Sequence, residues 1–362
     1  MRLCRGTVQS RFCTKKVVIL VVLVAVIVVV WVNLVLPHTP AQSAITDFVA
    51  SAAEDNTGVV ARAYQIYRHS VVWSEGYAKM FHIPGYPFDF YCKFYDKRMT
   101  KRHMAHTFTN STVVIGCGDQ SWPGDFWKTE KTWIYQSYQN VFAINLDRSK
   151  LTAEQQQRTI ALPLGVDFHT VEMSESGSWG LPHMSWDQQL HLLLSIRHSA
   201  PALHARQRKI LVTWTNTSTS SRRHTEYKQR PKLHHEAESN PNVFSIPLSK
   251  AVNRNHTWVQ MSETAFVYAP IGNGYDTHRM WEALLLGCIV VAQDSPVVRE
   301  FVDRFPIVVH NNPAQITQAD LAKWLRQFPE SASIKSLSMR SFFPQPPPRT
   351  NLTTVSLRRN LK

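Results

Sequence analysis

The chain has 362 residues, of which 44% are apolar and 11% aromatic. This length accommodates two ordinary domains, and this composition excludes an intrinsically disordered protein. The formal net charge of +14 raises the question of nucleic-acid binding. Part of that excess lies at Arg2, Arg5, Arg11, Lys15 and Lys16, before the first acidic residue. The rest of the chain has no dense run of Lys and Arg that would follow a phosphate backbone, so we expect no nucleic-acid partner.

An uncharged apolar segment follows at residues 17–36, with the sequence VVILVVLVAVIVVVWVNLVL. As a helix this segment would be about 30 Å long, which matches the hydrocarbon core of a bilayer. The alternative is a cleaved signal peptide, although the apolar core of such peptides is usually only about 7–15 residues long. The basic tail at 1–16 favours a cytosolic N-terminus. We therefore expect a single-pass type II protein, anchored by 17–36 in the Golgi or ER membrane, with the chain after residue 37 in the lumen.

Sequons and sparse cysteines agree with a luminal chain. The N-x-S/T sequons are at Asn110, Asn216, Asn255 and Asn351. Each predicts a surface position open to glycosylation. One alternative for Cys92 and Cys117 is that they form a disulfide with each other. Cys288 is then expected to be a small buried apolar residue. The histidines lack zinc-binding spacing and no Asp-x-Asp occurs, so we expect neither a metal site nor a bound cofactor.

After a small, polar stem at 37–60, apolar runs alternate with helical patterns. Runs typical of buried strands are 112–116, 141–146, 159–164, 209–214, 243–246, 264–269, 288–292 and 307–309. Apolar spacing typical of helices occurs at 187–199, 277–286 and 317–328. This alternation predicts an α/β fold with parallel sheets covered by helices. We expect two α/β domains at 61–200 and 201–335, followed by a mobile or surface-draped tail at 336–362.

The most informative segment is 266–291, FVYAPIGNGYDTHRMWEALLLGCIVV. A buried strand should end at Ala269, and a glycine-containing turn follows it. Asp276 or Thr277 is placed to cap the next helix, and Gly287 is a natural stop at its end. The pattern therefore predicts a strand, a turn, a helix and a second buried strand in immediate succession.

The turn and the start of this helix form a candidate anion site. In parallel sheets, ligands bind at the carboxyl ends of strands, where helix N-termini point. Backbone N–H groups of Gly272, Asn273, Gly274 and Asp276 therefore favour an anion such as a diphosphate. The alternative is a tight turn without a binding role. The sequence lacks the third glycine of a dinucleotide fingerprint and has no P-loop motif, so neither NAD nor P-loop chemistry is supported.

The helix itself supplies charged candidates for the same ligand. An Arg near a helix start suits a bidentate phosphate contact, and a carboxylate one turn further suits ribose hydroxyls. We assign Arg279, with His278, to the diphosphate and Glu282 to the ribose. Because Arg279 and Glu282 are three residues apart, the alternative is an ordinary ion pair on a helix surface.

These residues resemble a known family. The stretch GNGYDTHRMWEALLLGCIVV is similar to the nucleotide-sugar-binding region of exostosin-like glycosyltransferases, usually written G-N-G-x-D-T-H-R-x-W-E-A-L-x-x-G-x-I-P-V. It departs from that pattern at Val290, where Pro is common. GCGDQSWPGDFW (116–127), NVFAINL (140–146) and ALPLGVDFH (161–169) resemble the family's first domain more loosely. The resemblance covers roughly 110–310.

The resemblance implies a GT-B fold, in which two Rossmann-like domains enclose a cleft and the second domain holds the activated sugar. It also implies an inverting enzyme of the secretory pathway. Inversion in one displacement needs a general base for the acceptor hydroxyl. Our first candidate is Asp119, just after the strand 112–116, and the alternatives are Asp125, Asp167 and His169.

Further candidates surround this expected cleft. Trp122, Trp127 and His169 are candidates for stacking against an acceptor sugar, although aromatic residues more often belong to a core. Arg222 and Arg223 are second candidates for the phosphates, or else solvated surface residues. Since a GT-B enzyme can offset leaving-group charge with helix N-termini and basic side chains, the prediction does not need a metal.

Three functions remain open at this point. The leading hypothesis is a membrane-anchored glycosyltransferase that moves a sugar from a nucleotide sugar, such as a UDP-sugar, to a glycan or glycoprotein. The second is a catalytically silent glycosyltransferase-like subunit that binds a glycan or supports a partner enzyme. The third is a tethered α/β binding protein unrelated to glycosyl transfer, which would bind no nucleotide.

Overall fold

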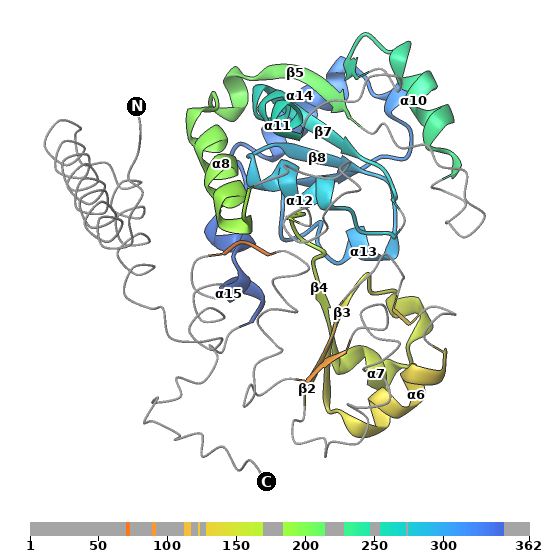
Figure 1. Ribbon diagram of the computed structural model, residues 1–362. Helices are drawn as coiled ribbons and strands as arrows, with labels where there is room; N and C mark the ends of the chain where they lie inside the picture. The colour runs from red at the N-terminus through yellow and green to blue at the C-terminus, as the bar shows by residue number, and fades with distance from the viewer. Residues whose placement is uncertain are drawn as a thin grey trace, which may run out of the picture. The chain divides into compact units, whose positions relative to one another are not determined.

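The computed structural model describes residues 70–72, 89–91, 112–116, 122–123, 128–168, 184–213, 228–246, 254–272 and 274–343. Within these ranges no helix is both long and apolar enough to cross a bilayer. The predicted anchor at 17–36 and the stem lie outside the described residues, as do Asn110, Asn216, Asn351, Cys92 and Cys117. The described part of the chain has an α/β fold with two parallel sheets, as the sequence predicts (Figure 1).

The first sheet contains four parallel strands in chain order. They are β1 (Asp89–Tyr91), β2 (Thr112–Ile115), β3 (Asn140–Ile144) and β4 (Thr159–Leu162). Its helices are α6 (Lys128–Ser137) and α7 (Ala153–Gln157). All four residues of β2 are buried, which explains its unbroken apolar sequence. Ile160 of β4, the last strand of this sheet, is exposed.

The second sheet contains five parallel strands, in the order β6-β5-β7-β8-β9. They are β5 (Gln207–Val212), β6 (Val243–Ser245), β7 (Thr264–Ala269), β8 (Ile289–Ala292) and β9 (Ile307–Val309). The accompanying helices are α8 (Trp186–Ser199), α10 (Arg230–Glu238), α11 (Arg254–Glu263), α12 (His278–Leu285), α13 (Pro296–Arg299) and α14 (Gln318–Gln327). Strand β6 lies on one side of β5, and β7, β8 and β9 lie on the other. The strand order therefore reverses between β5 and β7, which is the place where doubly wound sheets bind ligands.

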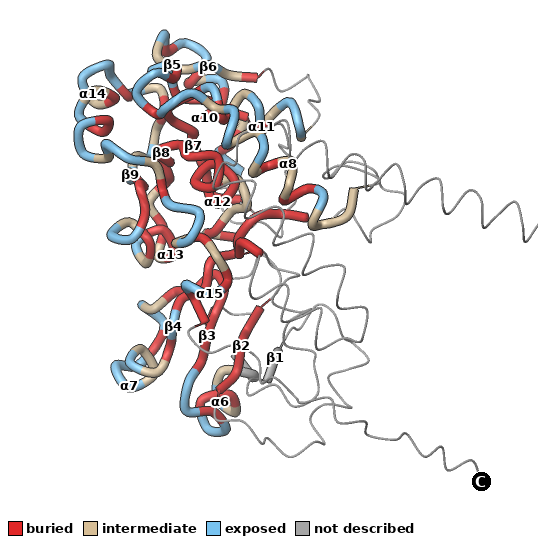
Figure 2. Tube along the Cα trace, turned by 90° about the vertical axis from the view of Figure 1, so that its left-hand side faces the viewer, coloured by how far each residue is buried: buried red, intermediate tan, exposed pale blue. Residues whose placement is uncertain are grey.

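Helices cover both faces of the second sheet because its strands are apolar on both sides. Along β7, Val267 joins the same buried cluster as α11 and α12. Its neighbours Phe266 and Tyr268 join the cluster that contains Trp324 of α14. Successive strand residues point to opposite faces, so the alternation follows directly from the strand geometry. The central strands β7 and β8 are buried along their whole length, while α14 keeps an exposed side (Figure 2).

Helix α12 ends where the sequence predicts. The Gly287 N–H donates to Leu284 O and the Cys288 N–H donates to Ala283 O, which is the hydrogen-bond pattern of a Schellman cap. Gly287 has a φ of +84°, which residues with a Cβ rarely adopt. Two guanidinium groups also bind carbonyls at this end, since half-buried Arg197 donates to Leu285 O at 2.6 Å and buried Arg206 donates to Leu286 O at 3.0 Å.

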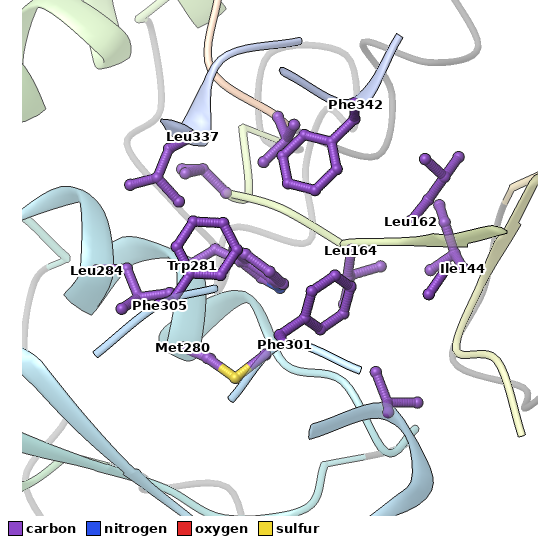
Figure 3. Packing of buried hydrophobic residues seen from close by; sticks show 14 of the residues in the cluster. Ile144, Leu162, Leu164, Met280, Trp281, Leu284, Phe301, Phe305, Leu337 and Phe342 are labelled. Carbon is purple, nitrogen blue, oxygen red and sulfur yellow. The ribbon is translucent and has the colours of Figure 1, made fainter. Parts of the chain in front are cut away.

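An apolar cluster joins the two sheets. Leu164, just after β4, belongs to the same buried cluster as Trp281 of α12 (Figure 3). The Trp281 ring meets Phe301 edge-on at 5.0 Å and Phe305 at 5.6 Å between ring centroids. Phe342 extends this group through a 6.4 Å contact with Phe305. The two sheets thus share one continuous hydrophobic core.

The segment at 335–343 corrects the expectation of a surface tail beginning at residue 336. Helix α15 (Met339–Phe342) follows a short 3-10 turn, and Leu337, Met339 and Phe342 are all buried. An antiparallel bridge joins Val71 to Ser338. This stretch contains enough apolar residues to pack in the core. The prolines at 346–348, which follow it and lie outside the described residues, made the whole segment resemble a surface tail.

Candidate functional site

The carboxyl ends of the two sheets face each other through hydrogen bonds. Asn145 follows β3 and accepts, through Oδ1, the Asp276 N–H at 2.7 Å. Gly165, after β4, accepts from His278 Nδ1 at 2.8 Å. Both Asp276 and His278 lie after the carboxyl end of β7. The loop that enters α12 is thereby fixed to the first sheet, beside the reversal point of the second.

The glycine turn after β7 is tightly built. The Gly272 N–H donates to Gly274 O at 3.0 Å. A Cβ on Gly272 would lie 3.1 Å from Cγ2 of Thr277, closer than an ordinary van der Waals contact. Glycine at 272 therefore lets the turn fold back against the start of α12. Asn273, which the sequence places in the same site, lies outside the described residues.

Arg279 lies at the reversal point of the second sheet, in contact with the carboxyl end of β5. It is half-buried, and its Nε donates to Oγ1 of Thr213 at 2.7 Å, at the carboxyl end of β5. Burial lowers the pKa of Arg279, and the neighbouring charges that act on it are Glu282 and Arg254. A guanidinium remains protonated in any case. Among the described residues it has no carboxylate within ion-pair distance, so its terminal nitrogens suit an anionic ligand.

Glu282 is held by α11 and not by Arg279. Arg254 Nη2 donates to Glu282 Oε1, and Trp258 Nε1 donates to Oε2 at 3.1 Å. The Glu282 side chain is only 8% exposed. The alternative of a surface ion pair between Arg279 and Glu282 is therefore wrong for this structure.

Arg254 joins the two sheets at this place. Its Nη1 donates to Asp167 Oδ2 at 3.0 Å, while its Nη2 serves Glu282. Burial alone would lower the pKa of Arg254, but the two carboxylates outweigh burial and raise it. One buried cation is therefore shared by a carboxylate after β4 and a carboxylate on α12.

Asp276 is buried in the contact between the sheets. Its Oδ2 accepts the Leu164 N–H at 2.7 Å and its Oδ1 accepts from Trp281 Nε1 at 2.8 Å. Burial raises the pKa of Asp276 to about 6, despite these hydrogen bonds. Of the two residues that the sequence offers as the helix cap, Asp276 or Thr277, Asp276 is not the N-cap. Thr277 occupies the N-cap position and makes no side-chain cap.

His278 contributes a second link to the first sheet. A carbonyl oxygen can only accept, so the bond to Gly165 O places a proton on Nδ1. In a neutral ring, Nε2 is then an acceptor. The side chain is half-buried beside Arg279, at the start of α12. Its position agrees with a role close to the predicted anion, and its Nδ1 is used to position the helix.

Most acceptor-side candidates lie outside the described residues, namely Asp119, Asp125, Trp127 and His169, and so do Arg222 and Arg223, the second candidates for the phosphates. Asp167 is described, and its carboxylate is engaged by Arg254. Trp122 is fully buried, with its Nε1 donating to Tyr135 OH at 3.4 Å. Trp122 therefore belongs to the core of the first sheet and does not stack on an acceptor.

Other sequence predictions can be located in the described ranges. Cys288 is buried and free, as expected, and burial raises the pKa of its thiol to about 11. Asn255 of the predicted sequon is exposed at the start of α11. No group of three or more His, Cys, Asp or Glu residues in the described ranges is placed to hold a metal ion.

Two residues of the site were missed by sequence reasoning. Thr213 follows the strand 207–212, so its place at a strand end was a usable signal. Arg254 lies before the motif and carries no local pattern that points to Glu282. Its role appears only when α11 packs beside α12.

No family model matches the chain, and no curated protein matches its sequence.

Proposed function

We propose that this protein is a glycosyltransferase of the GT-B type, which transfers a sugar from a nucleotide sugar to a glycan or glycoprotein. In this proposal the two parallel sheets belong to two Rossmann-like domains, and the donor binds at the reversal point of the second sheet. The observation that carries the proposal is Arg279, a half-buried guanidinium held there by Thr213 without a carboxylate partner among the described residues. The similarity of 272–291 to exostosin-like enzymes supports the same assignment.

The donor contacts follow from this geometry. Arg279 binds the diphosphate, together with His278 and the backbone N–H groups of Asn273 and Gly274. The Gly272 N–H is removed from the predicted donor contacts, because it donates to Gly274 O within the turn. Glu282 binds the ribose. Asp276 is removed from the predicted donor contacts, because its backbone N–H donates to Asn145 Oδ1 and both of its carboxylate oxygens accept hydrogen bonds at the junction between the sheets. Arg222 remains a predicted second phosphate contact.

The proposed reaction is a single displacement with inversion. The acceptor hydroxyl oxygen forms a bond to the anomeric carbon while the bond from that carbon to the diphosphate oxygen breaks. The hydroxyl proton passes to the general base, for which Asp119 stays our first candidate. The electron pair of the broken bond leaves on the nucleoside diphosphate, whose charge Arg279 and the start of α12 offset.

The cellular setting is part of the same proposal. Residues 17–36 anchor the chain in the Golgi or ER membrane as a single-pass type II protein, with the catalytic part in the lumen. The sequons, of which Asn255 is an exposed example, fit that compartment.

Calorimetric binding of UDP and GDP to the purified full chain tests the donor site. We expect one of them to bind, and Arg279→Ala to weaken its binding roughly ten- to a hundredfold, because a charge-assisted contact to phosphate is lost. Arg299→Ala is the matched control, since this arginine is exposed on α13 and pairs only with Asp294 among the described residues. Its affinity should equal that of the wild type.

Binding is then followed by a transfer assay with the corresponding nucleotide sugars. Sugar transfer supports the enzyme. Binding without transfer to any acceptor favours the silent subunit, and failure of both nucleotides to bind overturns the donor site.

A further inference from the structure

Helix α11 presents Arg254 and Trp258 one turn apart, on the side that meets α12. The Arg254 guanidinium lies 5.0 Å from the centroid of the Trp258 ring. Residues four apart share a helix face, so both side chains reach the same target. That target is Glu282, and each of its carboxylate oxygens accepts from a different one of the two donors.

With these two hydrogen bonds made, each carboxylate oxygen of Glu282 can still accept another hydrogen bond. An ionised carboxylate offers about four lone-pair sites. Arg254 and Trp258 use one site on each oxygen, so one further site remains on each. Two neighbouring acceptors match the two hydroxyls of a ribose diol.

Arg254 also ties the position of Glu282 to the first sheet. The guanidinium is a rigid planar fork, and its two terminal nitrogens serve Asp167 and Glu282. All three side chains are nearly buried, with exposures of 13% for Arg254, 10% for Asp167 and 8% for Glu282. A fork that contacts both carboxylates fixes where the Glu282 oxygens lie relative to Arg279.

We propose that Arg254 and Trp258 are positioning residues that orient Glu282 for the ribose hydroxyls of a ribonucleoside diphosphate. This inference rests on the proposed function, since it concerns the same donor site. It assigns no direct ligand contact to α11. The site thereby selects ribonucleotides over deoxyribonucleotides through an element that lies outside the motif.

The experiment measures the ratio of two dissociation constants on the full chain. The probes are UDP and GDP, each compared with its 2′-deoxy counterpart. For the wild type we expect the ribonucleotide to bind about tenfold more tightly, as the loss of a hydrogen bond to a charged group implies. In Arg254→Lys and in Trp258→Phe the ratio should fall at least threefold, towards one. Trp258→Phe retains most of the ring and loses only the Nε1 donor, so it tests the proposal even where Arg254→Lys does not fold.

Arg148→Met is the matched control for a merely structural role. Arg148 also links the two sheets, because its Nε donates to Glu300 at 2.5 Å. It has no contact with Glu282, so the ratio should stay at the wild-type value although the protein is less stable.

The outcomes separate the inference from the proposed function. If neither ribonucleotide binds the wild type, the proposed function fails. If one binds without preference for the ribose, or with a preference that survives in Trp258→Phe, the donor site stands and the positioning role is wrong. A ratio that falls equally in Arg148→Met also overturns the role, because any loosening of the junction would then suffice.

Discussion

The two sheets meet through an apolar region and a polar region, and the two regions differ in what they contribute. The apolar region consists of Leu164, Trp281, Phe301, Phe305 and Phe342 (Figure 3). Contacts among such side chains are strong in sum but non-directional. They hold the sheets together without fixing atoms to within a hydrogen-bond length.

The polar region consists of Asn145, Gly165, Asp276 and His278, with the Arg254 fork beside them. Each contact joins one named donor to one acceptor. A buried polar group without its partner is costly, so these contacts permit one arrangement and penalise others. The comparison indicates that the apolar residues hold the two sheets together and the polar residues fix their relative position. Trp281 takes part in both, through its ring and through the hydrogen bond of its Nε1.

Truncation of the apolar region should have the largest effect. We expect Trp281→Ala to lower the free energy of unfolding by about 3–5 kcal/mol, because a fully buried ring is removed from the shared core. Hydrogen exchange should show faster exchange in β4 as well as in β8. Trp324→Ala is the control, since this residue packs on the other face of the second sheet. If β4 remains as protected in Trp281→Ala as in Trp324→Ala, the shared core does not hold the sheets together.

The polar region should respond to pH. Burial raises the pKa of Asp276 from 3.8 to about 6. Between these values the folded state retains a proton that the unfolded state releases, so stability falls as the pH rises from about 4 to 6. Asp276→Asn does not titrate, and the wild type should lose about 3 kcal/mol relative to it over this range. Urea unfolding at a series of pH values measures this difference.

Asp294 provides a control of opposite sign. Its hydrogen bond with Arg299 lowers the pKa of Asp294. The contribution of Asp294 to the free energy of unfolding is therefore present above the ordinary carboxyl pKa and is lost as the pH falls. Relative to Asp294→Asn, the wild type should therefore lose stability on acidification. A difference between the wild type and Asp276→Asn that does not change with pH would contradict the buried position of that carboxyl.

The smallest effect is expected at the ion pair outside both regions. Arg148 and Glu300 link the sheets at 2.5 Å with side chains that are 33% and 17% exposed. Glu300→Gln should cost about 1 kcal/mol or less, and high salt should reduce the difference further. Melting temperatures at low and high salt provide the measurement. A loss as large as that of Trp281→Ala would place this pair among the main contacts between the sheets.

The sequence predicts the secondary structure around the site closely. The strand over β7 is predicted with its observed bounds, and α12 lies between its predicted cap and Gly287. Uninterrupted apolar strands and a glycine stop are local signals, so no knowledge of the rest of the chain is needed. The α/β class with two parallel sheets follows from the same patterns.

The partners of polar side chains are less predictable. Asp276 has the sequence of a helix cap, but its carboxylate binds the backbone of Leu164, which is far away in the chain. Glu282 is spaced for an ion pair with Arg279, but Arg254 reaches it from another helix. Such choices are decided by packing between elements, which local spacing does not record. Buried Trp122 illustrates the same limit for an aromatic residue.

The bridge between Val71 and Ser338 has a consequence for biosynthesis, because it pairs segments about 270 residues apart. Val72 also donates its N–H to Leu337 O, and Met339 donates its N–H to Ser70 O. While the chain is being translated, 70–72 emerges early, but its hydrogen bonds with 337–339 cannot form until almost every described residue has left the ribosome. Contacts between such distant segments form late. The segment 70–72, which is translated early, therefore completes its pairing only after 337–339 has been translated. A premature stop before residue 335 should leave the partners of 70–72 missing and so destabilise the region around it.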